Sequence, residues 1–305
     1  MKRFLVRLST FLLLFLSLSL GYTGVRIWLS AEDVERSMRF APTQKVLFMG
    51  DSHVGCTFIE GERYENCVLW ESSMPQQFTL MRLREMEKRG ALKNIELLVL
   101  DIGQQSIGQQ RKERMKELWW RMIPLSIRHY DLLPLSLWDR LEQYAKNPNG
   151  LIRIRHAAPD ADVSVLTRTP EERESNLRQI AAKHFNWINA PDEMCQGWER
   201  SLKSALDEIC ELCARNQVPL VFISAPLTSY YVNAIPRKAK EKLAELTDLI
   251  QDRRVPYYDL REWGEDDLFR DCFHFRLKGA RKFTEWFYEE IVPRHRKPKA
   301  HPPQA

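Results

Sequence analysis

The sequence predicts an α/β fold, in which a parallel sheet of about five strands lies between two layers of helices, as in flavodoxin-like proteins. Two observations support this prediction. Short apolar runs typical of buried strands recur along the chain, and stretches with helical spacing separate them. The 305 residues are 44% hydrophobic, which suffices for one well-packed domain of this class or for two modest ones. We place the α/β domain at residues 31–293.

Five apolar runs are predicted to be strands. The first, KVLFM at residues 45–49, ends at Gly50, which is the pattern of a buried parallel strand entering a turn. The others are CVLW at 67–70, IELLVLDI at 95–102, LVFIS at 220–224 and PYYDL at 256–260. Catalytic groups of such folds gather at the carboxyl ends of the strands, so the residues that follow these runs are candidates for a site.

Helical spacing appears between and after these runs. Leu80, Leu83 and Met86 share one face of a helix predicted over 78–89, and Gly90 ends it. The other predicted helices cover residues 198–216, 237–253 and 279–291.

Two segments depart from this alternation. A helical insertion at about 106–195 is rich in tryptophan and contains Trp119, Trp120, Trp138 and Trp187. For these side chains we favour helix packing over sugar stacking. The last residues, 294–305, carry prolines and basic side chains without an apolar pattern, so we expect a basic, disordered tail.

The N-terminal residues 1–30 are predicted to anchor the chain in a membrane. Lys2, Arg3 and Arg7 precede residues 8–25, which carry no charge and are rich in Leu and Phe. The length of this stretch lies between that of a signal peptide and that of a bilayer span, and no clean cleavage site follows it. We therefore favour an uncleaved signal anchor over a cleaved signal. The preceding cations predict export of the body to the periplasmic or extracytoplasmic side.

The net charge of +5 does not indicate a nucleic-acid partner. It is the difference between 46 basic and 41 acidic residues. Three basic residues precede residue 8 and four follow residue 293, where no acid occurs, so residues 8–293 carry 39 basic and 41 acidic groups. A nucleic-acid surface needs a basic field over the folded body, and the net charge of this body is −2.

The six cysteines of an exported chain are able to form disulfides, but the sequence does not assign their pairing. A contact between Cys56 and Cys67 at the start of the fold is one option. Cys210 and Cys213 form a CxxC pattern late in a predicted helix, whereas a redox pair sits at the start of one. We therefore expect Cys210 and Cys213 to be structural.

Two motifs near the ends of the body carry the chemistry. Ser52 follows the first strand in the sequence GDSH at 50–53, so its hydroxyl and backbone N–H project from the edge of the sheet, as a nucleophile with an adjacent oxyanion donor requires. Asp271 and His274 follow the last strand at a spacing of three, which lets the carboxylate hold one imidazole nitrogen while the other faces away. In isolation, an Asp-x-x-His is better interpreted as a turn cap beside a spectator histidine.

Together the two motifs resemble those of the SGNH, or GDSL-type, hydrolase superfamily. The first block of this family is a Gly-Asp-Ser turn after strand one, matched at 50–52. Its last block is Asp-x-x-His, matched at Asp271 and His274 and followed by Gly-Ala at 279–280. The resemblance implies that Ser52 is the nucleophile, that His274 is its base and that Asp271 orients His274.

The resemblance covers about residues 44–105 and 218–290 and is to the membrane-anchored or periplasmic members with a long helical insertion, some of which act on cell-surface polysaccharides. It implies a serine hydrolase or O-acyltransferase that acts on acyl esters, plausibly of a cell-surface glycan. We expect neither a cofactor nor a metal for this reaction.

Two blocks depart from the family pattern. The turn that supplies a glycine N–H to the oxyanion hole reads Glu71-Ser72-Ser73 here, and we expect Ser72 or Ser73 to donate instead. Where the family carries an asparagine amide after strand three, this chain has Gln104-Gln105, and we expect Gln105 or Gln104 to supply the amide. Loss of one oxyanion donor costs ~10²–10³ in rate, so these departures bear directly on activity.

Two other functions stay open. A membrane-anchored scaffold or polysaccharide-binding protein would keep the fold without efficient catalysis, and the altered oxyanion blocks and the insertion tryptophans favour it. A metal-dependent phosphoesterase would draw its ligands from Asp51, His53, Asp101, Asp271 and His274, although no HxH or HxxxH pair occurs among the seven histidines. Otherwise we expect His53 to line the wall of the site.

Overall fold

The computed structural model describes most of the α/β domain and the N-terminal segment. The described residues are 2–36, 43–71, 74–103, 115–119, 122–133, 135–136, 138–140, 142, 171–172, 175, 178–179 and 192–297. Most of the predicted insertion at 106–195 lies outside them.

One parallel sheet of five strands forms the centre of the domain. In chain order the strands are β1 (Val46–Gly50), β2 (Asn66–Trp70), β3 (Leu97–Asp101), β4 (Leu220–Ser224) and β5 (Tyr257–Asp259). Across the sheet they lie in the order β2-β1-β3-β4-β5, and all neighbouring strands are parallel. This is the flavodoxin-like order, in which the chain changes direction across the sheet at β1 and β3.

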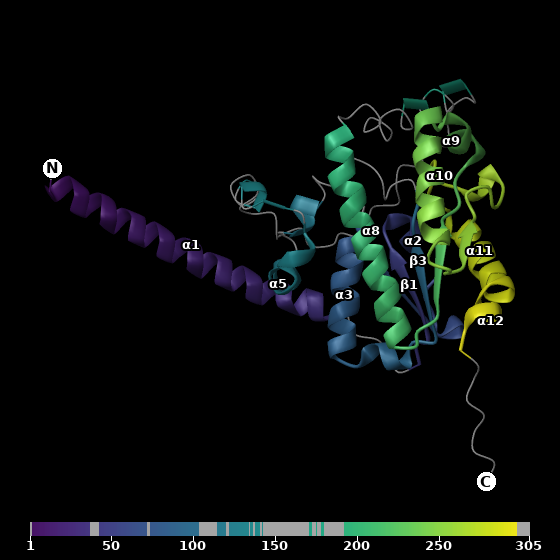
Figure 1. Ribbon diagram of the computed structural model, residues 1–305, viewed down its shortest axis with the longest axis horizontal. Helices are drawn as coiled ribbons and strands as arrows, with labels where there is room; N and C mark the ends of the chain where they lie inside the picture. Colours follow the sequence, from purple (N-terminus) through teal and green to yellow (C-terminus); the bar gives the residue numbers. More distant parts are fainter. Residues whose placement is uncertain are drawn as a thin grey trace, which may run out of the picture.

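Helices cover both faces of the sheet (Figure 1). The helices on one face are α3 (Gln76–Lys88), α8 (Asp192–Arg215) and α10 (Arg237–Gln251). The helices on the other are α2 (Ser52–Thr57), α11 (Leu277–Glu290) and α12 (Val292–His295). The shorter elements are α5 (Ile123–Arg128), α9 (Ser229–Ala234), η1 (Glu62–Tyr64), η2 (Ala91–Asn94), η4 (Tyr130–Leu132) and η7 (Asp266–Leu268). The predicted three-layer α/β fold is confirmed.

The central strands β1, β3 and β4 are almost wholly apolar because helices cover them on both sides. Every residue of β1, β3 and β4 is buried. In β1, Leu47 and Met49 belong to the core beneath α3 and α8, whereas Val46 and Phe48 belong to the core beneath α2 and α11. Two-sided burial removes the polar alternation of a strand with one wet face, which is why these strands appear in the sequence as continuous apolar runs.

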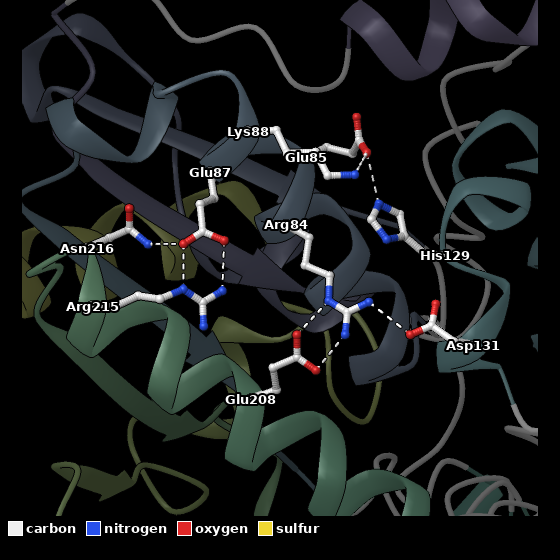
Figure 2. Close-up of polar contacts among 9 residues, drawn as sticks. All are labelled: Arg84, Glu85, Glu87, Lys88, His129, Asp131, Glu208, Arg215 and Asn216. Carbon is white, nitrogen blue, oxygen red and sulfur yellow. Dashed lines mark hydrogen bonds and ion pairs between the residues drawn. The ribbon is translucent and has the colours of Figure 1, made fainter.

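Polar side chains of α3 join it to α8 and to the α5–η4 segment (Figure 2). Arg84 donates to both carboxylate oxygens of Glu208 in α8, at 2.5 and 2.7 Å, and to Asp131 in η4 at 3.1 Å. One turn away, Glu87 accepts two bonds from Arg215 near the end of α8. These contacts are the polar complement of the apolar packing between α3 and α8.

Helix α1 (Lys2–Arg36) projects from the domain as one continuous helix and contacts α5 (Figure 1). Its stretch from Lys2 to Val25 is long and apolar enough to cross a membrane. The most apolar part of this stretch is not buried in the protein. A signal sequence has the same properties. The segment predicted at 1–30 thus forms a helix that continues to Arg36.

The predicted tail begins too early in the sequence. Arg294 belongs to α12, and Arg296 pairs with Glu65 and with Glu96, each at 2.5 Å. The N–H of Lys297 bonds the carbonyl of Glu96 at 3.1 Å. The folded body therefore includes these residues, because the basic side chains near the end of the chain meet acids from two distant loops. The rest of the predicted tail lies outside the described residues.

Five of the six cysteines have described side chains, and all five are free thiols. Cys56 and Cys67 therefore do not form the disulfide that the sequence left open. Cys213 of α8 is buried in the core, and burial raises the pKa of its thiol to about 12. Burial also raises the pKa of Cys210 to about 11. Thiols with pKa values this high are not reactive, as expected for structural residues.

Candidate active site

The two sequence motifs meet at the carboxyl edge of the sheet. Ser52 is the first residue of α2, directly after β1, and Asp271 and His274 lie in the loop between η7 and α11. Helix α11 packs against α2, which brings the two segments together. A Cβ atom on Gly279 would lie 2.5 Å from the carbonyl oxygen of Leu268, so only a glycine allows α11 to approach η7 this closely.

A continuous chain of hydrogen bonds joins the three predicted catalytic residues. The hydroxyl Oγ of Ser52 lies 3.1 Å from Nε2 of His274. On the other side of the ring, Nδ1 of His274 lies 2.8 Å from Oδ2 of Asp271. Nucleophile, base and orienting carboxylate therefore stand in the order and at the distances of a serine-hydrolase triad.

The backbone holds the carboxylate of Asp271 in place. Its second oxygen, Oδ1, accepts the backbone N–H groups of Phe273 at 3.0 Å and of His274 at 2.8 Å. Thr228 fixes the same loop, because both its N–H and its hydroxyl donate to the carbonyl of Cys272 at 3.0 Å. Four bonds to the backbone of the loop thus preorganise the carboxylate and the imidazole before any substrate binds.

The environment keeps His274 neutral and Asp271 ionised. Burial lowers the pKa of His274 below its ordinary value of 6.5 and outweighs the attraction of Asp271, and the neighbouring His53 lowers it further. Burial alone would raise the pKa of Asp271, but the hydrogen bonds from His274 and from the loop outweigh it, so this pKa lies below its ordinary value. Neutral imidazole beside a carboxylate is the resting state that a general base requires.

A second Asp–His pair lies against the triad. Oδ1 of Asp51 accepts the backbone N–H of His53 at 2.9 Å and lies 2.7 Å from its Nδ1. Both side chains are buried, and the ring of His53 stacks on that of His274 with a centroid distance of 5.5 Å. His53 is therefore a buried residue in the wall of the site, as the sequence predicted, and its charge also lowers the pKa of His274.

Asp101, at the end of β3, joins this second pair. One ligand atom each from Asp51, His53 and Asp101 lie within 4.8 Å of one another, and all three side chains are buried. Oδ1 of Asp101 accepts the N–H of Ala225 at 3.1 Å, and Nδ1 of His53 bonds Asp51. Asp271 and His274 bond each other and Ser52 instead, so the described residues do not bring all five candidate metal ligands together at one point.

Part of the predicted oxyanion hole lies outside the described residues. These positions are Ser72, Ser73, Gln104 and Gln105. Glu71, the residue before the two serines, lies beside the end of β1, because its N–H bonds the carbonyl of Gly50 at 3.4 Å. The N–H of Ser52 is available by its position, since the first N–H groups of a helix have no carbonyl partner within it. All of the oxyanion donors, Ser52 included, stay predictions.

Two further residues, Arg270 and Trp70, lie near the three predicted catalytic residues and were not predicted from the sequence. Arg270 lies with Nε 3.8 Å from Oδ2 of Asp271 and donates to Sγ of Cys56 at 3.4 Å, so it links the catalytic loop to α2. Trp70 ends β2, beside Gly50 in the sheet register, and is 41% exposed. The position of Trp70 at the carboxyl end of a predicted strand was the signal that could have identified it.

No family model and no curated protein sequence matches this chain. Among matching solved structures, a protein from Bacteroides fragilis named as a putative acylhydrolase has 10% sequence identity and a TM-score of 0.40, over 82% of this chain and 87% of that one. A GDSL-like lipase from Bacteroides thetaiotaomicron also has 10% identity and a TM-score of 0.40, over 88% of this chain and 97% of the other. A likeness at this level does not assign a function.

Proposed function

We propose that this chain is a membrane-anchored, exported serine hydrolase or O-acyltransferase of the SGNH type, which acts on acyl esters of a cell-surface glycan. The observation that carries the proposal is the chain of hydrogen bonds from Ser52 through His274 to Asp271. A separation of 3.1 Å between Oγ and Nε2 is within the reach of a general base that takes the serine proton. The uncharged stretch of α1 at residues 8–25 and the cations that precede it in the same helix support the anchor and the export.

The proposed reaction proceeds through an acyl-enzyme. Oγ of Ser52 attacks the carbonyl carbon of the ester while Nε2 of His274 takes the proton, and Asp271 stabilises the imidazolium. The N–H of Ser52, with Ser72 or Ser73 and Gln105, holds the negative oxygen of the tetrahedral intermediate. When the intermediate collapses, His274 returns the proton to the leaving alcohol and the acyl group stays on Ser52.

The acceptor decides between the two outcomes. His274, neutral again, deprotonates the group that attacks the acyl-enzyme. If this group is water, the products are a free acid and the original enzyme. If it is a hydroxyl of a sugar, the acyl group is transferred to the glycan. The same three residues serve both reactions, so the proposal covers hydrolysis and transfer.

The test uses full-length protein in detergent. We expect a fluorophosphonate to label Ser52, as located by mass spectrometry, and p-nitrophenyl acetate to be hydrolysed. Ser52→Ala should remove both signals. Addition of a sugar acceptor such as cellotetraose then separates transfer, seen as an acetylated sugar, from hydrolysis, seen as acetate. If the wild type shows neither labelling nor turnover, while Ser52→Ala still supports its cellular role, the protein is a scaffold.

A further inference from the structure

We propose that Trp70 is a stacking platform for a sugar ring of the substrate, directly beside the nucleophile. The inference rests on the proposed function and deepens it by naming a binding subsite. Trp70 is the last residue of β2, and its Cα is paired in register with Gly50, two residues before Ser52. Because neighbouring strands lie about 4.8 Å apart, the side chain of Trp70 starts close to the reacting hydroxyl.

The indole of Trp70 lies flat against the backbone of α2. A Cβ atom built on Gly55 would lie 2.3, 2.4 and 2.5 Å from Cδ2, Cε2 and Cγ of Trp70. These three atoms belong to the five-membered ring and are almost equidistant from the Cβ position. Gly55 therefore approaches the face of the ring and not its edge. Gly55 follows Ser52 by three residues in the same helix, so the ring packs about one helical turn from the nucleophile.

Part of Trp70 is open to solvent. Although Gly55 covers one face, Trp70 is 41% exposed, whereas Val68 on the same side of β2 packs against the core. The cause is topological, because β2 is the edge strand of the sheet that the described residues form. A tryptophan that the protein orients on one face and leaves accessible elsewhere presents a large, rigid apolar surface to a ligand.

A partly exposed indole that packs on Gly55 suits a sugar ring better than an acyl chain. An acyl chain gains most from an enclosed apolar pocket, in which nearly all of its surface is buried. A pyranose has apolar C–H groups on its face and hydroxyls around its rim, and those hydroxyls must keep polar partners or water. A flat, partly exposed indole meets the first need and leaves the hydroxyls at the rim of the ring in contact with water.

The tryptophans of the insertion provide a contrast. Trp119 packs against the core and lies beneath the guanidinium of Arg140, with 5.8 Å between Cζ and the ring centroid. Trp138 is 79% exposed and belongs to the insertion, whereas Trp70 ends a strand of the sheet. Trp138 is therefore the matched control, an exposed tryptophan outside the strand register that sets Trp70 beside Gly50.

The kinetic test compares esters that differ in one part only. Full-length protein in detergent is assayed on glucose 6-acetate, which has a sugar, on ethyl acetate, which has none, and on ethyl hexanoate, which has a longer acyl chain. We expect Trp70→Ala to raise KM for glucose 6-acetate about three- to tenfold, with kcat within about twofold and ethyl acetate unaffected. Trp70→Phe should retain much of the affinity, and Trp138→Ala should match the wild type.

Three results would overturn the platform: an equal loss on both acetates, which indicates that Trp70 only supports α2; a selective loss on ethyl hexanoate, which indicates an acyl-chain contact; or no change at all.

A binding measurement separates the platform from the proposed activity. Saturation-transfer NMR with cellotetraose and the Ser52→Ala protein should give a sugar signal that Trp70→Ala removes and Trp138→Ala preserves. If the wild type cleaves no ester but this pattern holds, the platform stands and the hydrolase proposal fails. If the sugar signal is missing or does not depend on Trp70, the platform is wrong whatever the enzyme hydrolyses.

Discussion

Asp51 and Asp271 hold their histidines in the same way. Each aspartate precedes a histidine by two or three residues, accepts backbone N–H bonds from the turn that it begins and holds Nδ1 of that histidine. The orientation of both imidazoles is therefore a local property of the chain. What is not local is the 3.1 Å contact between Ser52 and His274, which depends on packing across 222 residues of sequence.

The first prediction concerns the triad. Ser52→Ala should lower kcat on p-nitrophenyl acetate by about 10³-fold or more, and His274→Ala should cost nearly as much because triad members act as a unit. Asp271→Asn should leave a measurable remainder, since the amide disturbs the tautomer of His274 without removing the base. Initial rates measure these effects, with circular dichroism to check folding. A Ser52→Ala protein with the wild-type rate would exclude this mechanism.

The second prediction concerns pH. His274 acts in its neutral form, so kcat/KM should rise as the pH passes upward through its pKa, and burial places this step below pH 6.5. His53 and Arg270 both lower the pKa of His274. In His53→Gln, burial and Arg270 still lower the pKa of His274, but the contribution of His53 is lost. The step should therefore move to higher pH. His129→Gln, which removes a buried histidine far from the triad in sequence and fold, should leave the step in place. An unmoved step in His53→Gln would show that His53 does not act on the base.

At the scale of elements, a buried Glu–His pair holds the last turn of α3 (Figure 2). Oε1 of Glu85 lies 2.9 Å from Nε2 of His129, and both side chains are almost fully buried. Lys88 and Arg128 bond the same carboxylate at 3.1 and 2.8 Å. A carboxylate with this many partners couples α3 to the α5–η4 segment, which in turn contacts α1.

The third prediction tests this coupling. Glu85→Gln should lower the free energy of unfolding by about 1–3 kcal/mol, because it leaves Arg128 and His129 without their buried acid. Urea unfolding measures the change. Glu245→Gln is the matched control, since Glu245 is exposed and its pair with Lys242 at 2.7 Å should contribute close to nothing. Equal effects of the two changes would contradict a special role for Glu85.

The same pair sets the direction of the pH dependence of stability. Burial lowers the pKa of His129 below its ordinary 6.5, so the unfolded chain takes up this proton first and stability should fall as the pH drops below about 6.5. Burial alone would raise the pKa of Glu85, but its partners lower it below the ordinary 4.5. The stabilisation from Glu85 is complete above pH 4.5 and is lost as the pH falls through its folded pKa. His129→Gln should flatten only the first of these two windows in a thermal-unfolding series.

The fourth prediction concerns the cysteines of α8. Replacing Cys210 and Cys213 with alanine should lower the free energy of unfolding by about 1–3 kcal/mol in total, as the loss of small buried groups does. Activity per folded molecule should not change, because neither thiol is close to the triad in the fold and both are protonated at neutral pH. Lost activity at unchanged stability would instead indicate a redox function.

At the scale of the whole molecule, α1 and the α/β domain are built for different solvents. The apolar stretch of α1 has its side chains on the outside, whereas the apolar side chains of the domain are in two cores on either side of the sheet. In water, the exposed face of α1 would be costly, and a bilayer removes this cost. At the other end of the chain, Arg296 fixes the last described residues to the domain through ion pairs with Glu65 and Glu96.

The fifth prediction concerns topology. A reporter fused after residue 305 should be active only outside the cytoplasm, and the full-length protein should remain with the membranes after a carbonate wash. Replacing Lys2, Arg3 and Arg7 with glutamate should weaken this orientation. A soluble, cytoplasmic full-length protein would contradict the anchor and the export together, whereas release of the body into the periplasm would indicate a cleaved signal.

Local pattern was sufficient for much of this protein. Apolar runs identified the five strands of the sheet that the described residues form. The runs are continuous in β1, β3 and β4 because these strands are buried on both faces. The helical repeats identified α3, α8, α10 and α11 to within a few residues at most ends, since each repeat reflects one buried face. The three residues that the structure joins by hydrogen bonds were predicted for the same reason, because Asp271 and His274 are neighbours on one turn and Ser52 follows a strand.

Contacts between distant segments decided the rest. No local pattern shows that Arg296 reaches Glu65 and Glu96, so the sequence assigned it to a disordered tail. The sequence placed His53 in the wall of the site, but only the fold stacks it on His274. The sheet order makes β2 an edge strand and sets Trp70 on Gly55 beside the nucleophile. Strand order and helix packing create these neighbours, and a sequence read a few residues at a time does not contain them.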